Sequence, residues 1–218
     1  MKEPPFEILF ADNHLLAVNK PAGILTQPTA QEGESLELLL KQWVKERYQK
    51  PGNVFLGTVH RLDRPVSGVV LFARTSKALT RINEAVRSGK FQKRYVALVE
   101  GLFPQDEGIF EDQLCHGSHR AWISEETLSK QARLHFKVLQ RCAQKTLVRI
   151  ELETGRYHQI RLQFASRGFP ILGDQKYGSR IPLAGQRIAL HHQTLRFPHP
   201  ITQQLVEIET PVPFLKEV

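Results

Sequence analysis

Most of this chain consists of short segments in which hydrophobic residues alternate with polar ones or form brief apolar runs, which is typical of β-strands. Turn-forming residues separate these segments. The pattern predicts strands over residues 6–11, 15–19, 69–73, 94–100, 134–139 and 146–153, and a strand-like tail over residues 188–209. Residues 104–130 have no period, so we expect a long excursion or an irregular hairpin there.

Three segments have helical spacing instead. The first begins after Ser35, which suits an N-cap, and ends before Pro51 and Gly52. The second is expected from Ser76 to Arg87, with Ser76 as its cap and Gly89 as its C-terminal glycine. Its inward residues should be Leu79, Ile82 and Val86. The third is a short helix over residues 155–168. Because strands outnumber helices and do not alternate strictly with them, we expect an α+β fold with an antiparallel or mixed sheet.

Length and composition agree with one globular domain over residues 1–218. Hydrophobic residues make up 41% of the 218 residues, which is enough for a sizeable core. Neither a bilayer-spanning apolar run nor a signal region at Met1–Pro5 is present, so a cytoplasmic protein is the default expectation. Cys115 and Cys142 form no CxxC pair, and a reducing compartment is the simpler interpretation, although one bridge between them stays open.

The charge balance points to a polyanionic partner. The chain has 30 Lys and Arg against 22 Asp and Glu, and its pI is about 9.7. RNA, DNA and an anionic membrane surface all fit this excess. From Arg74 to Arg94, seven basic residues face one acid, Glu84, and flank Phe91 and Tyr95. This combination favours contact with RNA over a merely solvated helix face.

The densest group of reactive residues is the run 60–64, which contains His60, Arg61, Asp63 and Arg64 and precedes a buried strand. Loops on rigid strands often carry catalytic groups. Two neighbouring arginines favour an ionised Asp63, which suits a nucleophile or a base. The alternative is an aspartate that bonds its own backbone in a turn.

A second polar cluster, Thr154–Arg161, lies at the expected start of a helix, where backbone N–H groups favour anions such as phosphate. The alternative is a polar helix start with one solvated face. A metal site is a weak hypothesis, because Cys115, His116 and His119 have no matching second pair. The histidines 191, 192 and 199 are expected to be structural. The glycines follow no nucleotide-binding pattern, and nothing requires a cofactor.

Several segments together resemble the RluA family of pseudouridine synthases. The run HRLDRPVSG at residues 60–68 is similar to that family's HRLDxxTSG motif. Further similarities are the NKPAG segment at residues 19–23, KRYVALVEG at 93–101, TGRYHQIR at 154–161 and ILGD at 171–174 followed by Tyr177 and Gly178. Five ordered motifs are far more specific than any one of them.

The resemblance implies a mixed, largely antiparallel central sheet with flanking helices and a basic RNA-binding cleft. It also implies Asp63 as the catalytic carboxylate, Arg161 as its partner, Tyr95 against the target base, and Arg61 in the space that a flipped nucleotide leaves. Further expected RNA contacts are His60, Arg64, Lys93, Arg94, Arg156 and His158. No metal or cofactor is implied. We expect a monomer that binds RNA, with no membrane and no obligate protein partner.

The family's reaction breaks the bond from ribose C1′ to uracil N1 and rejoins C1′ to C5. Asp63 would attack C1′ or remove the 2′ proton to give a glycal, and both routes stay open. Val66 stands where the family usually has Thr, and Asp63-Arg64-Pro65 is similar to a subgroup that acts on tRNA, so tRNA and ribosomal RNA both remain candidate substrates. Because the pattern of the family's catalytic domain begins at about Phe6, we expect a stand-alone catalytic domain. The rival functions are RNA binding without turnover and hydrolysis that releases uracil.

Overall fold

The computed structural model describes residues 6–30 and 33–217, so the expectation about Met1–Pro5 lies outside the described residues. The chain forms two compact units. The first contains residues up to Phe91 and Thr194–Pro211, and the second contains Gln92–Gln193 and the residues from Val212 onward. A single domain over residues 1–218 stays a prediction.

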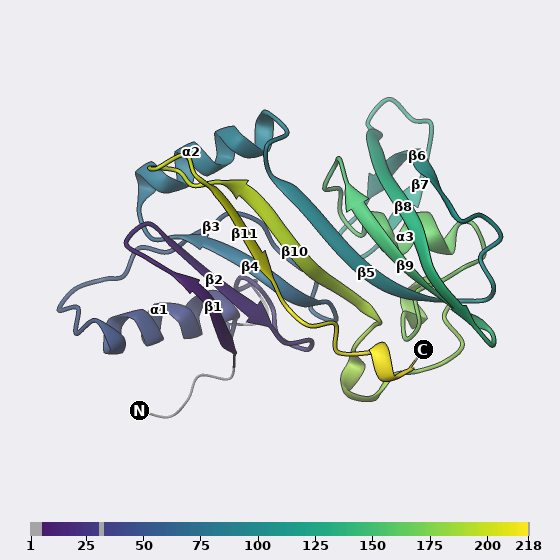
Figure 1. The fold of residues 1–218 in the computed structure, drawn as a ribbon, viewed down its shortest axis with the longest axis horizontal. Helices are drawn as coiled ribbons and strands as arrows, with labels where there is room; N and C mark the ends of the chain where they lie inside the picture. Colours follow the sequence, from purple (N-terminus) through teal and green to yellow (C-terminus); the bar gives the residue numbers. More distant parts are fainter. Residues whose placement is uncertain (1–5, 31–32, 218) are drawn as a thin grey trace. The chain divides into compact units, whose positions relative to one another are not determined.

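The first unit is built on antiparallel strands (Figure 1). Strand β2 pairs with β1 and β4, β3 pairs with β4, and β11 pairs with β10. The strands are β1 (Glu7–Ala11), β2 (Leu15–Lys20), β3 (Gly57–Thr58), β4 (Ser67–Ala73), β11 (Leu205–Glu209) and the second half of β10 (Leu190–Pro198). The strands expected at residues 6–11, 15–19 and 69–73 and in the tail are confirmed.

The two helices of the first unit are α1 (Leu36–Arg47) and α2 (Ser76–Arg87). Ser35 caps α1 as predicted. The predicted cap of α2 is wrong, because Thr75 has the extended backbone of a cap and its hydroxyl accepts a hydrogen bond from the Ala78 N–H at 3.1 Å. Gly89 follows the helix with a φ of +71°, as expected for a C-terminal glycine.

The inward face of α2 also differs in one position from the prediction. Val86 is 41% exposed, and Ala78, Ile82 and Ala85 are the buried residues. Ala78, Ile82 and Ala85 are spaced four and three residues apart and lie along one stripe of the helix. Short alanine side chains let α2 lie close to the strands.

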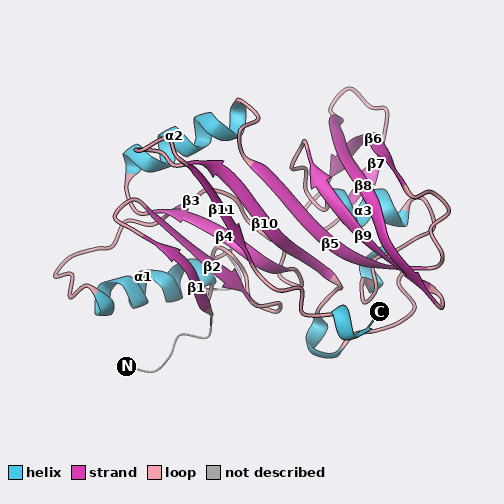
Figure 2. Cartoon of the chain, in the orientation of Figure 1, coloured by secondary structure: helices cyan, strands magenta, loops and turns pink. Residues whose placement is uncertain are grey.

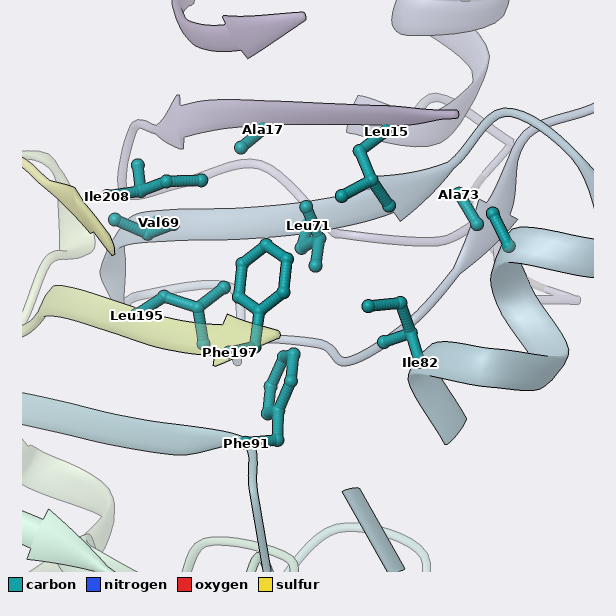
Figure 3. Close-up of a cluster of buried hydrophobic side chains, with 11 residues drawn as sticks. Leu15, Ala17, Val69, Leu71, Ala73, Ile82, Phe91, Leu195, Phe197 and Ile208 are labelled. Atoms are coloured by element: carbon teal, nitrogen blue, oxygen red, sulfur yellow. The ribbon is translucent and has the colours of Figure 1, made fainter. Parts of the chain in front are cut away.

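The core of the first unit lies between α2 and the sheet (Figure 3). Val69, Leu71 and Ala73 alternate along β4 and share one face, because successive side chains of a strand point to opposite sides. Phe91 and Phe197 pack there with ring centroids 5.7 Å apart. The cluster consists of Leu15, Ala17, Val69, Leu71, Ala73, Ala78, Ile82, Phe91, Leu195, Phe197 and Ile208.

The second unit is also antiparallel, with strand order β5-β9-β8-β6-β7. Its strands are β5 (Gln92–Glu100), β6 (Glu107–His116), β7 (Ala121–Ile123), β8 (Lys130–Cys142), β9 (Lys145–Leu152) and the first half of β10. The strands expected at residues 94–100, 134–139 and 146–153 are confirmed, and the last two are longer than predicted.

Residues 104–130 are more regular than their sequence suggests, because β6 pairs with β8 over eight residues and β7 turns back on it. The inward positions of β6 include Gly108 and Asp112, which hid the alternation. Gly108 makes room for the ring of Phe136, since a Cβ there would lie 2.9 Å from it. Asp112 is bound by Arg167 at 3.0 Å.

The helix α3 (Gln159–Ala165) packs against β6 and β7 (Figure 2). The predicted span 155–168 is too long, because His158 has a left-handed backbone with φ 54° and cannot belong to an α-helix. Phe103 packs on Phe110, Phe136 and Phe164 with centroid distances of 5.1–6.0 Å. Short 3₁₀ turns lie at η1 (Gln175–Tyr177), η2 (Ala184–Gln186) and η3 (Leu215–Glu217).

The α+β class is confirmed, and both cysteines are free thiols, Cys115 buried and Cys142 exposed. His199 is structural as expected, because its Nε2 lies 2.9 Å from the Asp12 carboxylate and its Nδ1 accepts the Thr202 N–H at 3.1 Å. No helix within residues 6–30 and 33–217 is long and apolar enough to cross a bilayer. The basic cleft stays a prediction.

Leu71→Ala should reduce the free energy of unfolding by about 2–5 kcal/mol, because Leu71 is fully buried in the core of the first unit and alanine leaves a cavity. Urea unfolding followed by circular dichroism measures the change. Leu205→Ala is the control, since Leu205 is exposed on β11 and its truncation should have little effect. Equal effects of the two substitutions would contradict this account of the core.

Candidate active site

Asp63 lies in the loop that joins β3 to β4 of the first unit. The Val66 N–H donates to the Asp63 carbonyl at 3.0 Å, which closes a turn directly before β4. The Asp63 side chain is half-buried. The carboxylate therefore sits on a short turn directly before a fully buried strand.

The backbone on both sides of Asp63 is anchored by residues 20–26. The Thr26 hydroxyl donates to the Leu62 carbonyl at 2.9 Å and accepts the Leu62 N–H at 3.1 Å. On the other side, the Gly23 N–H donates to the Arg64 carbonyl at 2.8 Å, and Arg64 Nε donates to the Gly23 carbonyl at 2.9 Å. These four bonds fix the positions of both neighbours of Asp63.

Lys20 adds a charge beneath this loop. Its side chain is fully buried, and its ammonium donates to the carbonyls of Pro21, Ile24 and Arg64 at 2.9, 2.8 and 3.2 Å. Burial lowers the pKa of Lys20 to about 7, Asp63 opposes this shift, and Arg64 adds to it. The three carbonyls also favour the ammonium form.

The other predicted residues of this loop differ in their surroundings. Arg61 is exposed. Arg64 is also exposed, and its Nε is the group that donates to the Gly23 carbonyl. His60 Nε2 accepts the Leu71 N–H at 3.2 Å, and its ring packs edge-on against Phe91 at 5.6 Å. His60 thus has a structural role, and its contact with RNA stays a prediction.

The predicted residues of β5 lie on both faces of the second unit's sheet. Tyr95 is buried and stacks on His192 with centroids 4.5 Å apart. Lys93 shares the face of Tyr95, and burial lowers its pKa. Gly155 lies so close that a Cβ there would be 3.0 Å from Lys93 Nζ. Arg94 points to the opposite face, where Glu151 binds it at 3.2 Å.

The turn before α3 is organised by the side chain of Gln159. Its Oε1 accepts the Thr154 hydroxyl at 2.8 Å and the Arg156 N–H at 3.0 Å, and its Nε2 donates to the Arg133 carbonyl at 3.1 Å. Arg156 Nε donates to the Gln131 carbonyl at 2.8 Å. The predicted anion-binding turn is therefore rigid, although a bound phosphate stays a prediction.

His158 has a strained left-handed backbone, and its ring is held on both sides. It stacks on Tyr157 with centroids 3.8 Å apart, and its Nδ1 lies 2.8 Å from the Tyr177 hydroxyl. That hydroxyl also accepts the Ala121 N–H at 2.9 Å, so it links His158 to β7. Non-glycine residues with this backbone are rare and concentrate at functional sites.

Arg161 is buried in α3 and forms two hydrogen bonds with Asp174. Its Nε lies 2.7 Å from Oδ2 and its Nη2 lies 2.8 Å from Oδ1, with side chains 6% and 1% exposed. The guanidinium also lies 5.2 Å from the Tyr177 ring centroid. A two-pronged pair of this kind fixes the plane of the guanidinium.

The predicted catalytic residues thus belong to different units, Asp63 to the first and Tyr95 and Arg161 to the second. The pairing of Arg161 with Asp63 stays a prediction.

Sequence reasoning missed the supporting residues. Lys20, Asp174, Tyr177 and Gln159 lie inside the quoted motifs and were available from them, but Thr26 carried no signal. Within the described residues, no three His, Cys, Asp or Glu side chains are grouped to hold a metal.

Comparison with known proteins agrees with these motifs. The family model described as RNA pseudouridylate synthase matches residues 14–166, which include Asp63, Tyr95 and Arg161. The chain belongs to this family. An uncharacterised RNA pseudouridine synthase of Bacillus subtilis is 36% identical over 95% of the synthase and 68% of the relative. The ribosomal large subunit pseudouridine synthase D of Pseudomonas aeruginosa is 34% identical, with coverage of 95% and 68%.

Solved structures support the fold of the synthase. Human RNA pseudouridylate synthase domain containing 4 superposes with a TM-score of 0.79 at 20% identity, covering 95% of the synthase and 88% of the human chain. Human RNA pseudouridylate synthase domain containing 1 superposes with a TM-score of 0.77 at 23% identity, covering 98% of the synthase and 86% of the human chain. The expected pseudouridine synthase fold is confirmed, and the synthase is an RNA-modifying isomerase.

The stability of the synthase should depend on pH through Lys20. The unfolded chain binds more protons than the folded one between pH about 7 and 10.5, because the Lys20 pKa is 10.5 ordinarily and about 7 in the folded state. The free energy of unfolding should therefore rise with pH across this window through this group and be unaffected by it below the window. Urea unfolding at several pH values should show a smaller rise for Lys20→Met than for the wild type. Identical pH profiles would contradict the depressed pKa.

Thr26→Val should slow catalysis, because it removes the hydroxyl that holds both backbone groups of Leu62 and leaves Asp63 less well placed. We expect kcat to fall roughly ten- to hundred-fold with a smaller change in KM. Thr26→Ser should restore kcat, since it keeps the hydroxyl. A loss of thermal stability without a loss of kcat would show that Thr26 is merely structural.

Proposed function

We propose that this synthase converts specific uridines of ribosomal or transfer RNA to pseudouridine with Asp63 as its nucleophile or base. The observation that carries the proposal is the anchorage of the Asp63 backbone by Thr26 and Gly23. A carboxylate carried on a fixed backbone can meet a reacting atom at a lower entropic cost than one on a mobile loop. Large-subunit ribosomal RNA is the first substrate to test, because relatives such as the Pseudomonas aeruginosa protein carry that substrate in their names.

The proposed chemistry is an isomerisation, so nothing is gained or lost overall. In the first route, the Asp63 carboxylate attacks C1′ and the C1′–N1 electron pair leaves with uracil. The base rotates, C5 attacks C1′ and displaces Asp63, and the C5 proton is exchanged for one on N1. In the second route, Asp63 removes the 2′ proton, the C2′–H electron pair forms a C1′–C2′ double bond, and the C1′–N1 pair leaves with uracil. C5 then joins C1′, the 2′ proton returns to C2′, and the C5 proton is exchanged for one on N1.

The remaining roles follow the family resemblance. We propose Tyr95 as the residue that holds the loosened uracil and Arg161 as the cation that favours the ionised Asp63. The stacking of Tyr95 on His192 and the two-pronged bond of Arg161 to Asp174 support fixed positions for both side chains. The target must leave its stack, at a cost of a few kcal/mol that contacts with phosphates offset. Arg61, Arg64, Lys93 and Arg156 are the proposed cationic contacts, and His60, Arg94 and His158 are further proposed RNA contacts.

Asp63→Asn should lower turnover by at least roughly a hundred-fold and leave RNA affinity largely intact, since it removes a reactive carboxylate and no positive charge. Nucleoside mass spectrometry of unmodified ribosomal RNA and tRNA after incubation measures pseudouridine. Asp106→Asn is the control, because Asp106 is an exposed carboxylate paired with Arg141.

The same assay separates the rival functions. Wild-type protein that binds RNA but forms no pseudouridine in either RNA class would favour a binding protein without turnover. Free uracil among the products would favour a hydrolase. Near-normal activity of Asp63→Asn would refute the assignment of the carboxylate while leaving the family's reaction in place.

A further inference from the structure

The end of α1 and the loop that follows it carry exposed aromatic side chains. Tyr48 is 44% exposed and Phe55 is 49% exposed. Aromatic rings are usually buried because their apolar area is large, so exposed rings close together in sequence suggest a contact surface. Figure 1 shows that α1 leads into this loop at the left edge of the view.

These rings form one surface with residues of the β4–α2 connection. Trp43 meets Tyr48 edge-on at 6.2 Å, and the Arg74 guanidinium lies 4.3 Å from the centroid of the Tyr48 ring. Phe55 borders Gly57, whose strand pairs with Ala73 beside Arg74. We call this surface the α1-end patch, and it consists of Trp43, Lys45, Arg47, Tyr48, Lys50, Phe55 and Arg74.

The α1-end patch is strongly basic. Lys45, Arg47 and Lys50 are exposed, and Arg74 is held by the Asp12 carbonyl and the Tyr48 hydroxyl. The acid within the same stretch of helix, Glu46, accepts a hydrogen bond from Gln42 at 2.9 Å. Several exposed cations elsewhere are paired with acids. Lys137 pairs with Glu107, Arg141 with Asp106, and Arg196 with Glu207.

We infer that the α1-end patch binds RNA at nucleotides away from the target uridine, an inference that rests on the proposed function. Cations attract phosphates without regard to sequence, and exposed aromatic rings accept stacked bases. The Arg74 guanidinium over the Tyr48 ring adds a flat cationic surface of the kind that also stacks on bases. RNA offers both phosphates and bases, and the chain belongs to a family of enzymes that act on RNA, so RNA is the partner to which this surface is assigned.

Helix α1 sets the distance between this surface and the Asp63 loop. At its N-terminal end, the Glu37 N–H donates to the Thr26 carbonyl at 3.1 Å, and Thr26 in turn holds Leu62. The helix has 12 residues and is therefore about 18 Å long. An RNA that contacts both the Asp63 loop and the α1-end patch must extend that far from the target uridine. The α1-end patch therefore selects the length of the substrate and not the identity of the target base.

The test compares two triple variants that lose the same charge. Lys45→Gln, Arg47→Gln and Lys50→Gln alter the patch, and Lys137→Gln, Arg141→Gln and Arg196→Gln remove paired cations elsewhere. The substrates are unmodified large-subunit ribosomal RNA transcript and a short stem-loop around the modified uridine. On the long RNA, the patch variant should lose about ten-fold or more in kcat/KM through KM, and its salt slope should fall by about one for each cation removed. On the stem-loop, it should match the wild type.

A further variant, Tyr48→Ala with Phe55→Ala, should weaken binding of the long RNA without changing the salt slope, because it removes stacking and no charge. Equal losses in the patch and control variants, or equal losses on both RNAs, would overturn the inference. Loss of binding to phosphatidylserine vesicles with unchanged RNA binding would assign the surface to a membrane and would also overturn it. Direct RNA binding separates this outcome from failure of the proposed function, since affinity is measured without turnover.

Discussion

The organisation of the first unit's site depends on the hydrogen bonds between residues 20–26 and the two neighbours of Asp63. A loop aspartate has many accessible directions in an unanchored chain, and each must be lost before the carboxylate can meet one reacting atom. Here that loss occurs during folding. The Thr26 hydroxyl satisfies both backbone groups of Leu62, and Gly23 and Lys20 do the same for the Arg64 carbonyl.

Both units contain buried cations, and the two are stabilised in different ways. Lys20 is a compact charge met by three carbonyl oxygens, which replace part of its lost hydration. Arg161 is a planar charge met by the Asp174 carboxylate in a matching two-pronged geometry. Buried charges are costly and add little net stability. Their value here is geometric, since Lys20 ties the end of β2 to the loop at Arg64 and Arg161 ties α3 to the turn at Asp174.

Much of the fold was predictable because the burial pattern is regular. The paired strands β8 and β9, the helix α1 and its Ser35 cap follow directly from period and cap chemistry. Strand β6 was missed because Gly108 and Asp112 occupy inward positions, where partners elsewhere in the chain make glycine and a charge acceptable. No local pattern contains those partners. The start of α3 was missed because His158 has a left-handed backbone, a conformation that the local pattern of residues does not predict.

The candidate site was also predictable only in part, because some of its residues lie in motifs and others act through distant partners. Residue identities in the motifs singled out Asp63, Tyr95 and Arg161, whereas the hydrogen bonds that hold the site were invisible. Thr26 is an example, because its bond to Leu62 spans 36 positions and a threonine in a loop has no distinctive pattern. Arg94 is another, since adjacency to Tyr95 suggested a shared site, yet strand alternation places it on the other face with Glu151.

The alternation along β5 also limits how this sequence can change in length. One inserted or deleted residue between Lys93 and Tyr95 would exchange the two faces of the strand and bring Arg94 to the position of the tyrosine. The mostly exposed loop between β7 and β8, at residues 124–129, belongs to no strand and has no such alternation. Length variants that keep a working enzyme are therefore expected in loops of this kind, and β5 keeps a constant length while its individual side chains remain open to substitution.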